Sequence, residues 1–387
     1  MTAGPREPVD RLRVACVIGG MQAGGAERVM AQLCNYFAVR GHDVTLVTLA
    51  PAGEESFYEL SEAVRYWPMG RAVQGRWLGR PGRVATWIAR LRRTFVQLQP
   101  DVVISFIELT NVMILLATLG LRIPVVVSER IDPGAYRARL SRLERWLCRL
   151  TYPRAARIAV QTARAADFFR DYPAAKLVTI PNPVPAALAT ARPDATTSDG
   201  RYRIIGVGRL DPQKGFDRLI DSFAGLAARF PQWDVAIFGQ GPERAALLSQ
   251  IERHGLSDRI RLMGVTKDIA AEYARAHVMA FPSRYEGFPN ALAEGMAAGL
   301  PAVAFEDVSG VEDLIVADNT GLLARDSAAA ENAIQSLTEQ LRRLLESAAL
   351  RARLGAAARE RIGEFRPDIV MTRWDDLVAA VIRENRR

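Results

Sequence analysis

Short apolar runs alternate with helical patterns along this chain of 387 residues, and the alternation forms two series. The runs end at glycine, proline and other turn residues, which is typical of strands buried on both faces of a parallel sheet. Strands that alternate with helices predict a doubly wound α/β sheet. Because one hydrophobic core rarely organises a chain of this length, we expect two Rossmann-like α/β domains.

The first series fills the N-terminal half of the chain. A long apolar stretch within it, residues 102–127, is interrupted by charged, polar and turn residues. We therefore interpret this stretch as strand, helix and strand, and not as a membrane span. Strands are predicted at residues 12–18, 44–49, 102–106 and 125–127, and helices at 24–39, 84–98 and 111–119.

The second series follows a proline-rich stretch, residues 181–200, in which periodicity is lost. We place the linker between the two domains in this stretch. The C-terminal residues 367–382 have the apolar spacing of a final helix. Strands of the second series are predicted at residues 203–206, 235–238, 260–263, 278–281 and 302–305.

The segment from Glu286 to Glu294 is the first candidate ligand site, because it follows a predicted strand and leads into a helix. Its backbone amides at a helix N-terminus can face an anion such as a diphosphate. Glu294 offers a carboxylate to the hydroxyls of a ribose, and Glu286 offers one to a sugar. A capped helix with two solvated carboxylates is the alternative. The anion-binding candidates between the two glutamates are Gly287, Phe288, Pro289 and Asn290.

Two basic residues follow the first strand of the second series, with Arg209 and Lys214 five positions apart beside glycines. A guanidinium and an ammonium together can neutralise a diphosphate, although a solvated pair of basic residues is the alternative. Open α/β sheets bind ligands at the carboxyl ends of their strands, where both segments lie. A third segment, Gly24-Gly25, lacks the full spacing of a dinucleotide fingerprint, and a structural turn explains it equally well.

Together these residues resemble glycosyltransferase family 4, whose members have the GT-B fold of two Rossmann-like domains facing a central cleft. The resemblance covers essentially the whole chain. It rests on the spacing of Glu286 and Glu294, the Arg209 and Lys214 pair, the Gly24-Gly25 loop, and the late segments 309–315 and 320–323.

The resemblance implies an assignment of the two domains. Residues 1–182 would form an N-terminal acceptor-binding domain, onto which the C-terminal helix 367–387 packs back. Residues 183–366 would form a domain that binds a nucleotide sugar. The Gly24-Gly25 loop would touch the phosphate or sugar of this donor.

The resemblance also implies a retaining, metal-independent hexosyltransferase that needs no cofactor and uses a nucleotide diphosphate sugar as co-substrate. Arg209 and Lys214 would bind the diphosphate and act in catalysis with Glu286, which binds the sugar hydroxyls, while Glu294 binds the ribose. Cations and backbone dipoles would then stabilise the leaving group in place of a divalent ion. The sequence agrees, because it has no Asp-x-Asp pair or histidine cluster that could hold a metal.

The substrates implied by the resemblance are those of bacterial surface polysaccharide, lipopolysaccharide or lipid-linked oligosaccharide synthesis. The favoured donor is a UDP-linked hexose or N-acetylhexosamine, with GDP-mannose next. The acceptor would be lipid-linked or a glycan. A sugar nucleotide epimerase of similar fold and a non-catalytic partner subunit are the other function classes that stay open.

The chain departs from the family pattern after the fourth strand of the N-terminal domain, where many members carry a histidine. This sequence has Glu108 and Asn111 there. Glu129, Arg130 and Asp132 follow the next predicted strand and are expected near the acceptor, with a structural ion pair as the alternative. No chemistry is assigned to the histidines, which we interpret as surface turns at His42 and His254 and as the start of a buried strand at His277.

Basic charge is concentrated in the N-terminal half. Residues 1–180 hold 25 basic and 15 acidic side chains, a net charge of +10, whereas the remainder holds 26 and 28, a net charge of −2. Such patches favour an anionic surface. No nucleic-acid recognition motif is present, and tryptophans lie among the arginines, so we expect a membrane surface. The arginines include eight in residues 65–93 and a cluster at Arg137, Arg139, Arg142, Arg145, Arg149, Arg154 and Arg157, and the tryptophans are Trp67, Trp77, Trp87 and Trp146.

The remaining features indicate the compartment. Cys16, Cys34 and Cys148 have no metal-ligand spacing, and their odd number argues against a disulfide framework. The first ten residues lack the apolar core of a secretory signal. We therefore expect a cytoplasmic protein that is peripheral on the inner face of the plasma membrane.

Overall fold

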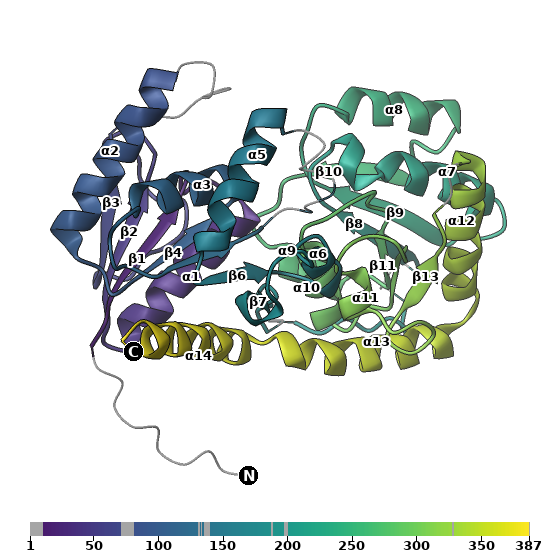
Figure 1. The fold of residues 1–387 in the computed structure, drawn as a ribbon. Helices are drawn as coiled ribbons and strands as arrows, with labels where there is room; N and C mark the ends of the chain where they lie inside the picture. Colours follow the sequence, from purple (N-terminus) through teal and green to yellow (C-terminus); the bar gives the residue numbers. More distant parts are fainter. Residues whose placement is uncertain are drawn as a thin grey trace, which may run out of the picture. The chain divides into compact units, whose positions relative to one another are not determined.

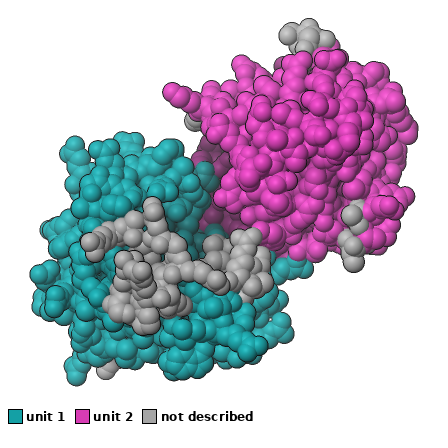
Figure 2. Space-filling view, turned by 90° about the horizontal axis from the view of Figure 1, so that it is seen from above, with its two compact units in different colours: residues 1–181, 370–387 teal, residues 182–369 magenta. Residues whose placement is uncertain are grey.

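The computed structural model describes residues 11–70, 81–130, 132, 134, 140–186, 189–196, 200–326 and 329–386. The chain divides into two compact units, each an α/β domain of its own (Figures 1 and 2). Unit 1 comprises Met1–Pro181 and Val370–Arg387, and unit 2 comprises Asn182–Ile369. The chain therefore passes from unit 1 to unit 2 one residue before the predicted boundary at 182.

Unit 1 is built on a sheet with the strand order β3-β2-β1-β4-β5-β6-β7, in which neighbouring strands run parallel. The order reverses direction between β1 and β4, as in a doubly wound fold. The central strands are buried along almost their whole length, which explains their continuous apolar sequences. The strands are β1 (Arg13–Ile18), β2 (Asp43–Thr48), β3 (Val64–Pro68), β4 (Val102–Phe106), β5 (Val125–Ser128), β6 (Arg157–Val160) and β7 (Leu177–Thr179).

Helices cover the two faces of this sheet. Phe37, Trp374 and Val378 are buried in one core, and Leu91, Phe95 and Ile114 in the other. Trp374 belongs to the last helix, so the end of the chain completes the core of unit 1. The helices of unit 1 are α1 (Gly25–Val39), α2 (Pro81–Leu98), α3 (Glu108–Ala117), α5 (Arg142–Thr151), α6 (Ala163–Asp167) and α14 (Pro367–Asn385), the last of which starts in unit 2.

Unit 2 repeats this plan with the parallel strand order β10-β9-β8-β11-β12-β13. Its strands are β8 (Tyr202–Val207), β9 (Trp233–Phe238), β10 (Ile260–Gly264), β11 (Val278–Phe281), β12 (Ala302–Phe305) and β13 (Leu322–Ala324). Its helices are α7 (Phe216–Ala227), α8 (Arg244–Arg253), α9 (Ile269–Ala274), α10 (Asn290–Ala297), α11 (Val311–Leu314), α12 (Ala330–Glu346) and α13 (Ala348–Ile362). The fold class predicted from the sequence, two Rossmann-like doubly wound units, is confirmed.

Three strands, β3, β6 and β7, were not predicted, whereas β13 overlaps the late segment 320–323 that the family resemblance indicated. Two of the three, β3 and β7, lie at the edges of the unit 1 sheet, and most of their residues are only partly buried. An edge strand does not need a continuous apolar run. The third, β6, has only four residues and begins with Arg157.

Most of the predicted linker packs on unit 2. The amide of Val184 donates to the carbonyl of Phe365 at 2.8 Å, and that of Ala191 donates to Ala298 at 2.8 Å. The Arg351 Nε donates to the Pro193 carbonyl at 2.6 Å. Because hydrogen bonds to its own backbone groups hold this segment on unit 2, its sequence needs neither helical nor strand periodicity.

His42 is buried, so its interpretation as part of a surface turn was wrong. Its Nδ1 accepts a hydrogen bond from the Leu12 amide at 3.2 Å, beneath the end of α1. Burial lowers the pKa of this imidazole. His277 is buried in unit 2, where its Nδ1 accepts from the Arg203 amide at 2.9 Å, whereas His254 is more exposed and contacts Asp221.

Candidate functional site

The predicted site residues of unit 2 come from two strands that are neighbours in the sheet. β8 pairs with β11, so the segments that follow them start at the same edge. Arg209 and Lys214 follow β8, and Glu286 follows β11. The carboxyl edge of this parallel sheet therefore brings together side chains that are more than seventy residues apart in sequence.

Lys214 and Glu286 form an ion pair in which Nζ of the lysine lies 2.6 Å from Oε1 of the glutamate. Both side chains are largely buried, with 20% and 7% of their surface exposed. The Ser283 hydroxyl donates to the same Oε1 at 2.8 Å, and the Gln213 amide approaches Oε2 at 3.4 Å. The carboxylate is thus held from several sides, so its position is defined before any ligand binds.

Close backbone packing fixes the turn that carries Lys214. Gly215 has φ of +65°, and a Cβ atom there would lie 2.1 Å from the Pro282 carbonyl oxygen. A side chain at this position would therefore clash with the loop after β11 as well as strain the backbone. The Arg284 amide also donates to the Gln213 carbonyl at 2.7 Å, which joins the two loops directly.

Arg284 supports the same junction through its side chain. Its guanidinium contacts both carboxylate oxygens of Asp217, at 2.9 Å and 2.6 Å, and donates to the Pro212 carbonyl. Burial alone would raise the pKa of Asp217, but the hydrogen bonds and charge of Arg284 outweigh it, and the pKa is lowered. The first turn of α7 is thereby tied to the loop after β11.

Arg209 has a different environment from Lys214. Its side chain is 69% exposed, and its Nε lies 2.5 Å from Oδ2 of Asp211. The structure therefore brings two of the three predicted catalytic side chains together and leaves the third on the surface nearby.

The segment from Gly287 to Asn290 leads into α10, which begins at Asn290. Phe288 is buried in the core of unit 2, and the Asn182 amide donates to Oδ1 of Asn290 at 3.0 Å. Glu294 lies one turn inside α10, is half-buried, and has its Oε2 at 3.5 Å from the Tyr273 hydroxyl. The start of this helix is anchored, and Glu294 is oriented by a neighbouring helix.

Two polar partners of the ion pair, Gln213 and Ser283, were not predicted. Each is adjacent or nearly adjacent in sequence to a predicted residue, Gln213 before Lys214 and Ser283 three positions before Glu286. A hydroxyl or amide close in sequence to a candidate site carboxylate could have indicated these partners, because a buried charge needs hydrogen bonds.

Gly24 and Gly25 lie at the start of α1 in unit 1. The Tyr58 hydroxyl donates to the Gly24 carbonyl at 2.8 Å and accepts from the Gly24 amide at 3.1 Å. Burial raises the pKa of Glu27, although a backbone hydrogen bond opposes it. The loop is therefore held in place by side chains of unit 1.

Buried polar side chains gather after β4 and β5 of unit 1. The Tyr152 hydroxyl donates to Oε1 of Glu129, and the Asn111 amide donates to Tyr152 at 3.2 Å. Burial, followed by the charge of Glu129, raises the pKa of Tyr152 far above its ordinary value. Glu108 and Glu129 both line a pocket of about 700 Å³. Glu108 follows β4, where the family's histidine was expected, so a carboxylate lies at that position.

Arg130 packs against aromatic rings. Its guanidinium carbon lies 3.9 Å from the ring centre of Phe106 and 5.4 Å from that of Trp374. Burial lowers the pKa of Arg130 to about 9. Asp132, the third residue of this group, accepts a hydrogen bond from the Gly134 amide at 2.6 Å.

Two family models match almost the whole chain. The model described as Glycosyltransferase Family 4 matches residues 23–188, and the one described as Glycosyl transferases group 1 matches residues 189–361. The chain belongs to glycosyltransferase family 4. The resemblance stated from the sequence motifs is thereby confirmed, and the two matched regions meet near the boundary between the two units.

Relatives of this family 4 glycosyltransferase include bacterial polysaccharide enzymes. The chain is 25% identical to the amylovoran biosynthesis glycosyltransferase AmsD of Erwinia amylovora, over 93% of this chain and 97% of that protein. It is 24% identical, over 96% and 99%, to an α-1,4-N-acetyl-D-galactosaminyltransferase of Campylobacter jejuni that is named for a diphospho-undecaprenol-linked glycan. A match to an exopolysaccharide phosphotransferase of Streptomyces coelicolor is 33% identical over 54% of this chain but spans only 21% of that protein.

Solved structures share the fold over nearly the full length of this glycosyltransferase. Sucrose-phosphate synthase of Thermosynechococcus elongatus aligns with a TM-score of 0.80 and 19% identity, over 97% of this chain and all of that one. Anabaena HepE in complex with UDP aligns with a TM-score of 0.76 and 17% identity, over 95% and 100%. The GT-B fold class expected from the sequence is therefore confirmed.

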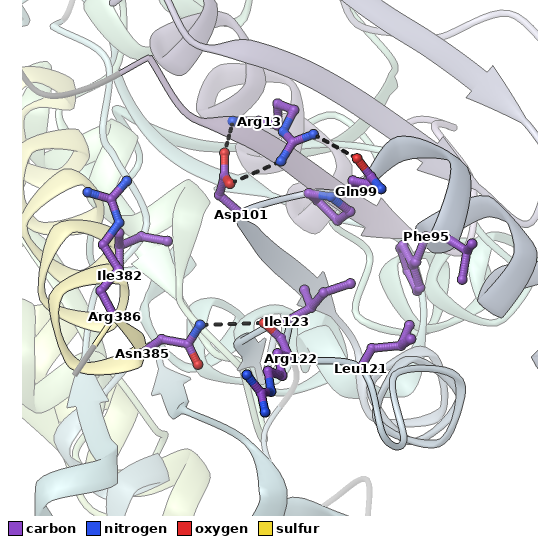
Figure 3. A pocket seen from close by; sticks show the side chains of 12 residues that line it. Arg13, Phe95, Gln99, Asp101, Leu121, Arg122, Ile123, Ile382, Asn385 and Arg386 are labelled. Carbon is purple, nitrogen blue, oxygen red and sulfur yellow. Dashed lines mark hydrogen bonds and ion pairs between the residues drawn. The ribbon is translucent and has the colours of Figure 1, made fainter.

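A further pocket of this glycosyltransferase lies at the amino ends of the unit 1 strands, opposite the carboxyl ends that Glu108 and Glu129 follow (Figure 3). It is formed where β1 and β4 begin and where α14 ends, and its lining includes Arg13, Asp101, Arg122 and Ile382. The Asp101 carboxylate accepts the Arg13 amide at 2.7 Å and contacts its guanidinium. Because this pocket lies at the amino ends of the strands, it is not the site predicted from the motifs.

Neither a metal-binding cluster nor a membrane-spanning helix is found in the described part of this family 4 glycosyltransferase. The described residues contain no group of three or more His, Cys, Asp or Glu side chains placed to hold a metal ion. Among the helices that the structure describes, none combines the length and the apolar character needed to cross a bilayer.

Proposed function

We propose that this glycosyltransferase moves a hexose or N-acetylhexosamine from a nucleotide diphosphate sugar to a lipid-linked or glycan acceptor, with retention at the anomeric carbon. The ion pair between Lys214 and Glu286 carries the proposal. It places a cation suited to a diphosphate beside a carboxylate suited to sugar hydroxyls, at the carboxyl edge of the unit 2 sheet.

In this proposal Lys214 and Arg209 neutralise the diphosphate as it leaves. Arg209 is 69% exposed although its partner Asp211 is only 12% exposed, so the guanidinium is accessible to a phosphate, which can replace or share its contact with Asp211. Two positioned cations would stabilise charge that develops on the leaving group, and neither a divalent ion nor another cofactor would be required.

The other donor contacts follow from the anchored start of α10. The backbone amides of Gly287 and Phe288, just before α10, would face a phosphate, because the N-terminal end of a helix favours anions. Pro289 has no N–H and the Asn290 N–H donates to the Phe288 carbonyl at 2.9 Å, so these two residues would shape the turn beneath the phosphate. Glu294, one turn further, would accept hydrogen bonds from the ribose. Gly24 and Gly25 would be the contribution of unit 1 to donor binding.

A UDP-sugar is the favoured donor and GDP-mannose the next. HepE, which shares the fold, was solved with UDP, and the Campylobacter relative is named as an N-acetylgalactosaminyltransferase with a diphospho-undecaprenol-linked acceptor. By this similarity the proposed role is cell-surface polysaccharide or glycolipid synthesis. We propose a cytoplasmic enzyme at the inner face of the plasma membrane, where the net charge of +10 of residues 1–180 favours anionic lipids.

The proposal is tested by following release of nucleoside diphosphate from UDP-glucose, UDP-N-acetylglucosamine, UDP-N-acetylgalactosamine and GDP-mannose. Each donor is incubated with and without undecaprenyl-diphosphate-linked glycans, in the presence and absence of EDTA. One donor should be consumed only with acceptor present, at a rate that EDTA leaves unchanged, and NMR of the product should show the anomeric configuration of the donor.

Three results would contradict parts of this proposal. An inverted product would overturn retention, and loss of activity in EDTA that Mg²⁺ restores would overturn metal independence. Conversion of a donor without any acceptor into an isomerised nucleotide sugar would replace transfer with epimerisation.

A further inference from the structure

Helix α5 of unit 1 exposes a row of large apolar side chains. Leu143, Trp146 and Leu150 are 50%, 57% and 55% exposed. They are spaced three and four residues apart, so they lie on one face of the helix. We call these three residues the α5 ridge. A contiguous apolar row of this kind on a surface marks an interaction site more often than single exposed residues do.

The helix that carries the ridge is firmly built. Ser141 and Glu144 form a capping box at its N-terminus, with the Ser141 amide 2.7 Å from the Glu144 carboxylate. Leu147 packs against the core of unit 1, and Thr151 is buried. The ridge is therefore exposed because of the side of the helix it occupies, and not because the helix end is frayed.

Three arginines run along the same helix beside the ridge. Arg142, Arg145 and Arg149 are exposed and have the same helical spacing as the ridge. The single acidic residue of α5, Glu144, is engaged in the capping box. One side of the helix is thus apolar and the adjoining side is positively charged.

Three of the four tryptophans that lie among the arginines in sequence are described by the structure, and they differ in how exposed they are. Trp67 and Trp87 pack against the core of unit 1, and Trp77 lies outside the described residues. Trp146 alone of the described three is more than half exposed. Of the arginine cluster, Arg137 and Arg139 lie outside the described residues as well. Among these tryptophans and this cluster, α5 is therefore where an exposed tryptophan and exposed arginines lie together, and the expected membrane surface is assigned to this helix.

We propose that α5 docks on the surface of an anionic phospholipid bilayer, with the ridge among the headgroups and upper acyl chains and the arginines on lipid phosphates. Charge complementarity favours this occupant, because residues 1–180 carry a net charge of +10 and the arginines adjoin the apolar face. Tryptophan and arginine are the side chains that suit the headgroup region, since each combines an apolar body with a polar end.

Docking through α5 would also bring a pocket of unit 1 to the membrane surface. Its use as an acceptor pocket rests on the proposed function. The α5 arginines and Trp146 also line the pocket of about 700 Å³ whose wall includes Glu108 and Glu129. A helix docked through its ridge would hold this pocket at the level of lipid headgroups. A lipid-linked acceptor could then present its sugar to the carboxylates without leaving the bilayer.

Vesicle sedimentation of the full chain tests the docking. Vesicles of phosphatidylcholine alone are compared with vesicles that also contain phosphatidylglycerol, using wild type and the double variant Trp146→Ser/Leu150→Ser. Val39→Ser is the matched control, because Val39 is 83% exposed on α1 of the same unit. Wild type and Val39→Ser should bind the anionic vesicles, and the double variant should bind at least about tenfold more weakly, as expected for withdrawing a large apolar side chain from a bilayer.

Further experiments test the contribution of the arginines to binding and the possibility that a second copy of the chain covers the ridge. Arg145→Gln/Arg149→Gln should weaken binding to anionic vesicles and reduce its salt dependence. Failure of wild type to bind anionic vesicles, or equal binding by the double variant, would overturn the proposal. Self-association of wild type in light scattering that the double variant loses would assign the ridge to a second copy of the chain. UDP-dependent thermal shifts of the same variants should be unchanged, so a failure of docking is separate from a failure of donor binding.

Discussion

The ammonium nitrogen of Lys214 lies 2.6 Å from Oε1 of Glu286, so the two strongest sequence motifs of the chain are in direct contact through this ion pair. Ser283 and Gln213 hold the carboxylate, while Gly215 and Arg284 join the loops on which the two residues lie. A site whose polar groups are positioned in advance stabilises developing charge without reorganising during the reaction.

Lys214→Ala and Glu286→Gln should both impair transfer, but in different ways. Loss of the ammonium should weaken binding of nucleoside diphosphate and lower kcat by about 10²–10³, the usual cost of removing one preorganised charge-stabilising group. Glu286→Gln should lower kcat/KM for the sugar donor while leaving the Kd of free nucleoside diphosphate within about threefold, because it alters a sugar contact. Steady-state kinetics and calorimetric titration measure the two effects. Lys267→Ala, an exposed lysine of the same unit, is the control and should change neither.

Gly215→Ala should destabilise unit 2 more than Gly255→Ala. Both glycines have φ of +65°, so both substitutions incur the backbone strain of an L-residue, about 1–2 kcal/mol. A Cβ at Gly255 meets nothing within 4 Å, whereas one at Gly215 would lie 2.1 Å from the Pro282 carbonyl. Urea unfolding of both variants measures the difference. Equal losses of stability would show that the close approach of the two loops does not matter.

Unit 2 should lose stability below pH 6.5 through His277. Burial, together with the charges of Arg351 and Arg203, lowers the pKa of this imidazole from its ordinary value of 6.5, although hydrogen bonds to Ala195 and Arg203 oppose the shift. Below pH 6.5 the unfolded chain binds a proton that the folded unit does not, so the free energy of unfolding falls as the pH falls toward the lowered pKa.

His277→Gln should flatten this dependence. Urea midpoints are compared between pH 5 and pH 8 for wild type, His277→Gln and the more exposed control His254→Gln. The slope of the midpoint against pH should be smaller in His277→Gln than in wild type and unchanged in His254→Gln. Identical slopes in all three proteins would assign the dependence to other groups.

Trp374→Ala should destabilise unit 1 by about 3–5 kcal/mol, the usual cost of truncating a fully buried aromatic residue. Trp374 is completely buried in the core of unit 1 and lies against Arg130 and Phe106. Trp146→Ala removes the same side chain from an exposed position and should cost far less. Calorimetric scans of the two variants measure this, and a similar small loss in both would place α14 outside the cooperative core of unit 1.

The sequence predicted the parts of the fold whose physical signature is local. The central strands, such as β1 and β11, are buried on both faces and therefore read as apolar runs. The edge strand β3 could not be predicted, since most of its residues are only partly buried and its sequence is therefore not a continuous apolar run. His42 was misread because burial beneath α1 depends on tertiary packing and not on its neighbouring residues.

The same distinction applies to the candidate site. The positions of Lys214 and Glu286 at one sheet edge followed from strand order, which is predictable for an open α/β sheet. The pairing of Arg209 with Asp211 and the contacts of Ser283 depend on side-chain rotamers that no spacing rule supplies. The ridge on α5 could not be recognised either, because helical spacing alone does not say which apolar face is covered.

A thermal shift panel tests the central claim most directly. UDP, GDP, ADP and their sugars are added to wild type, Lys214→Ala and the control Lys267→Ala, because a ligand that binds only the folded state raises the apparent Tm. We predict a selective rise with one nucleotide, UDP in the first place, that is retained in Lys267→Ala and reduced in Lys214→Ala. No shift with any nucleotide in the folded wild type, or an equal shift in all three proteins, would contradict a nucleotide-sugar site built on Lys214 and Glu286.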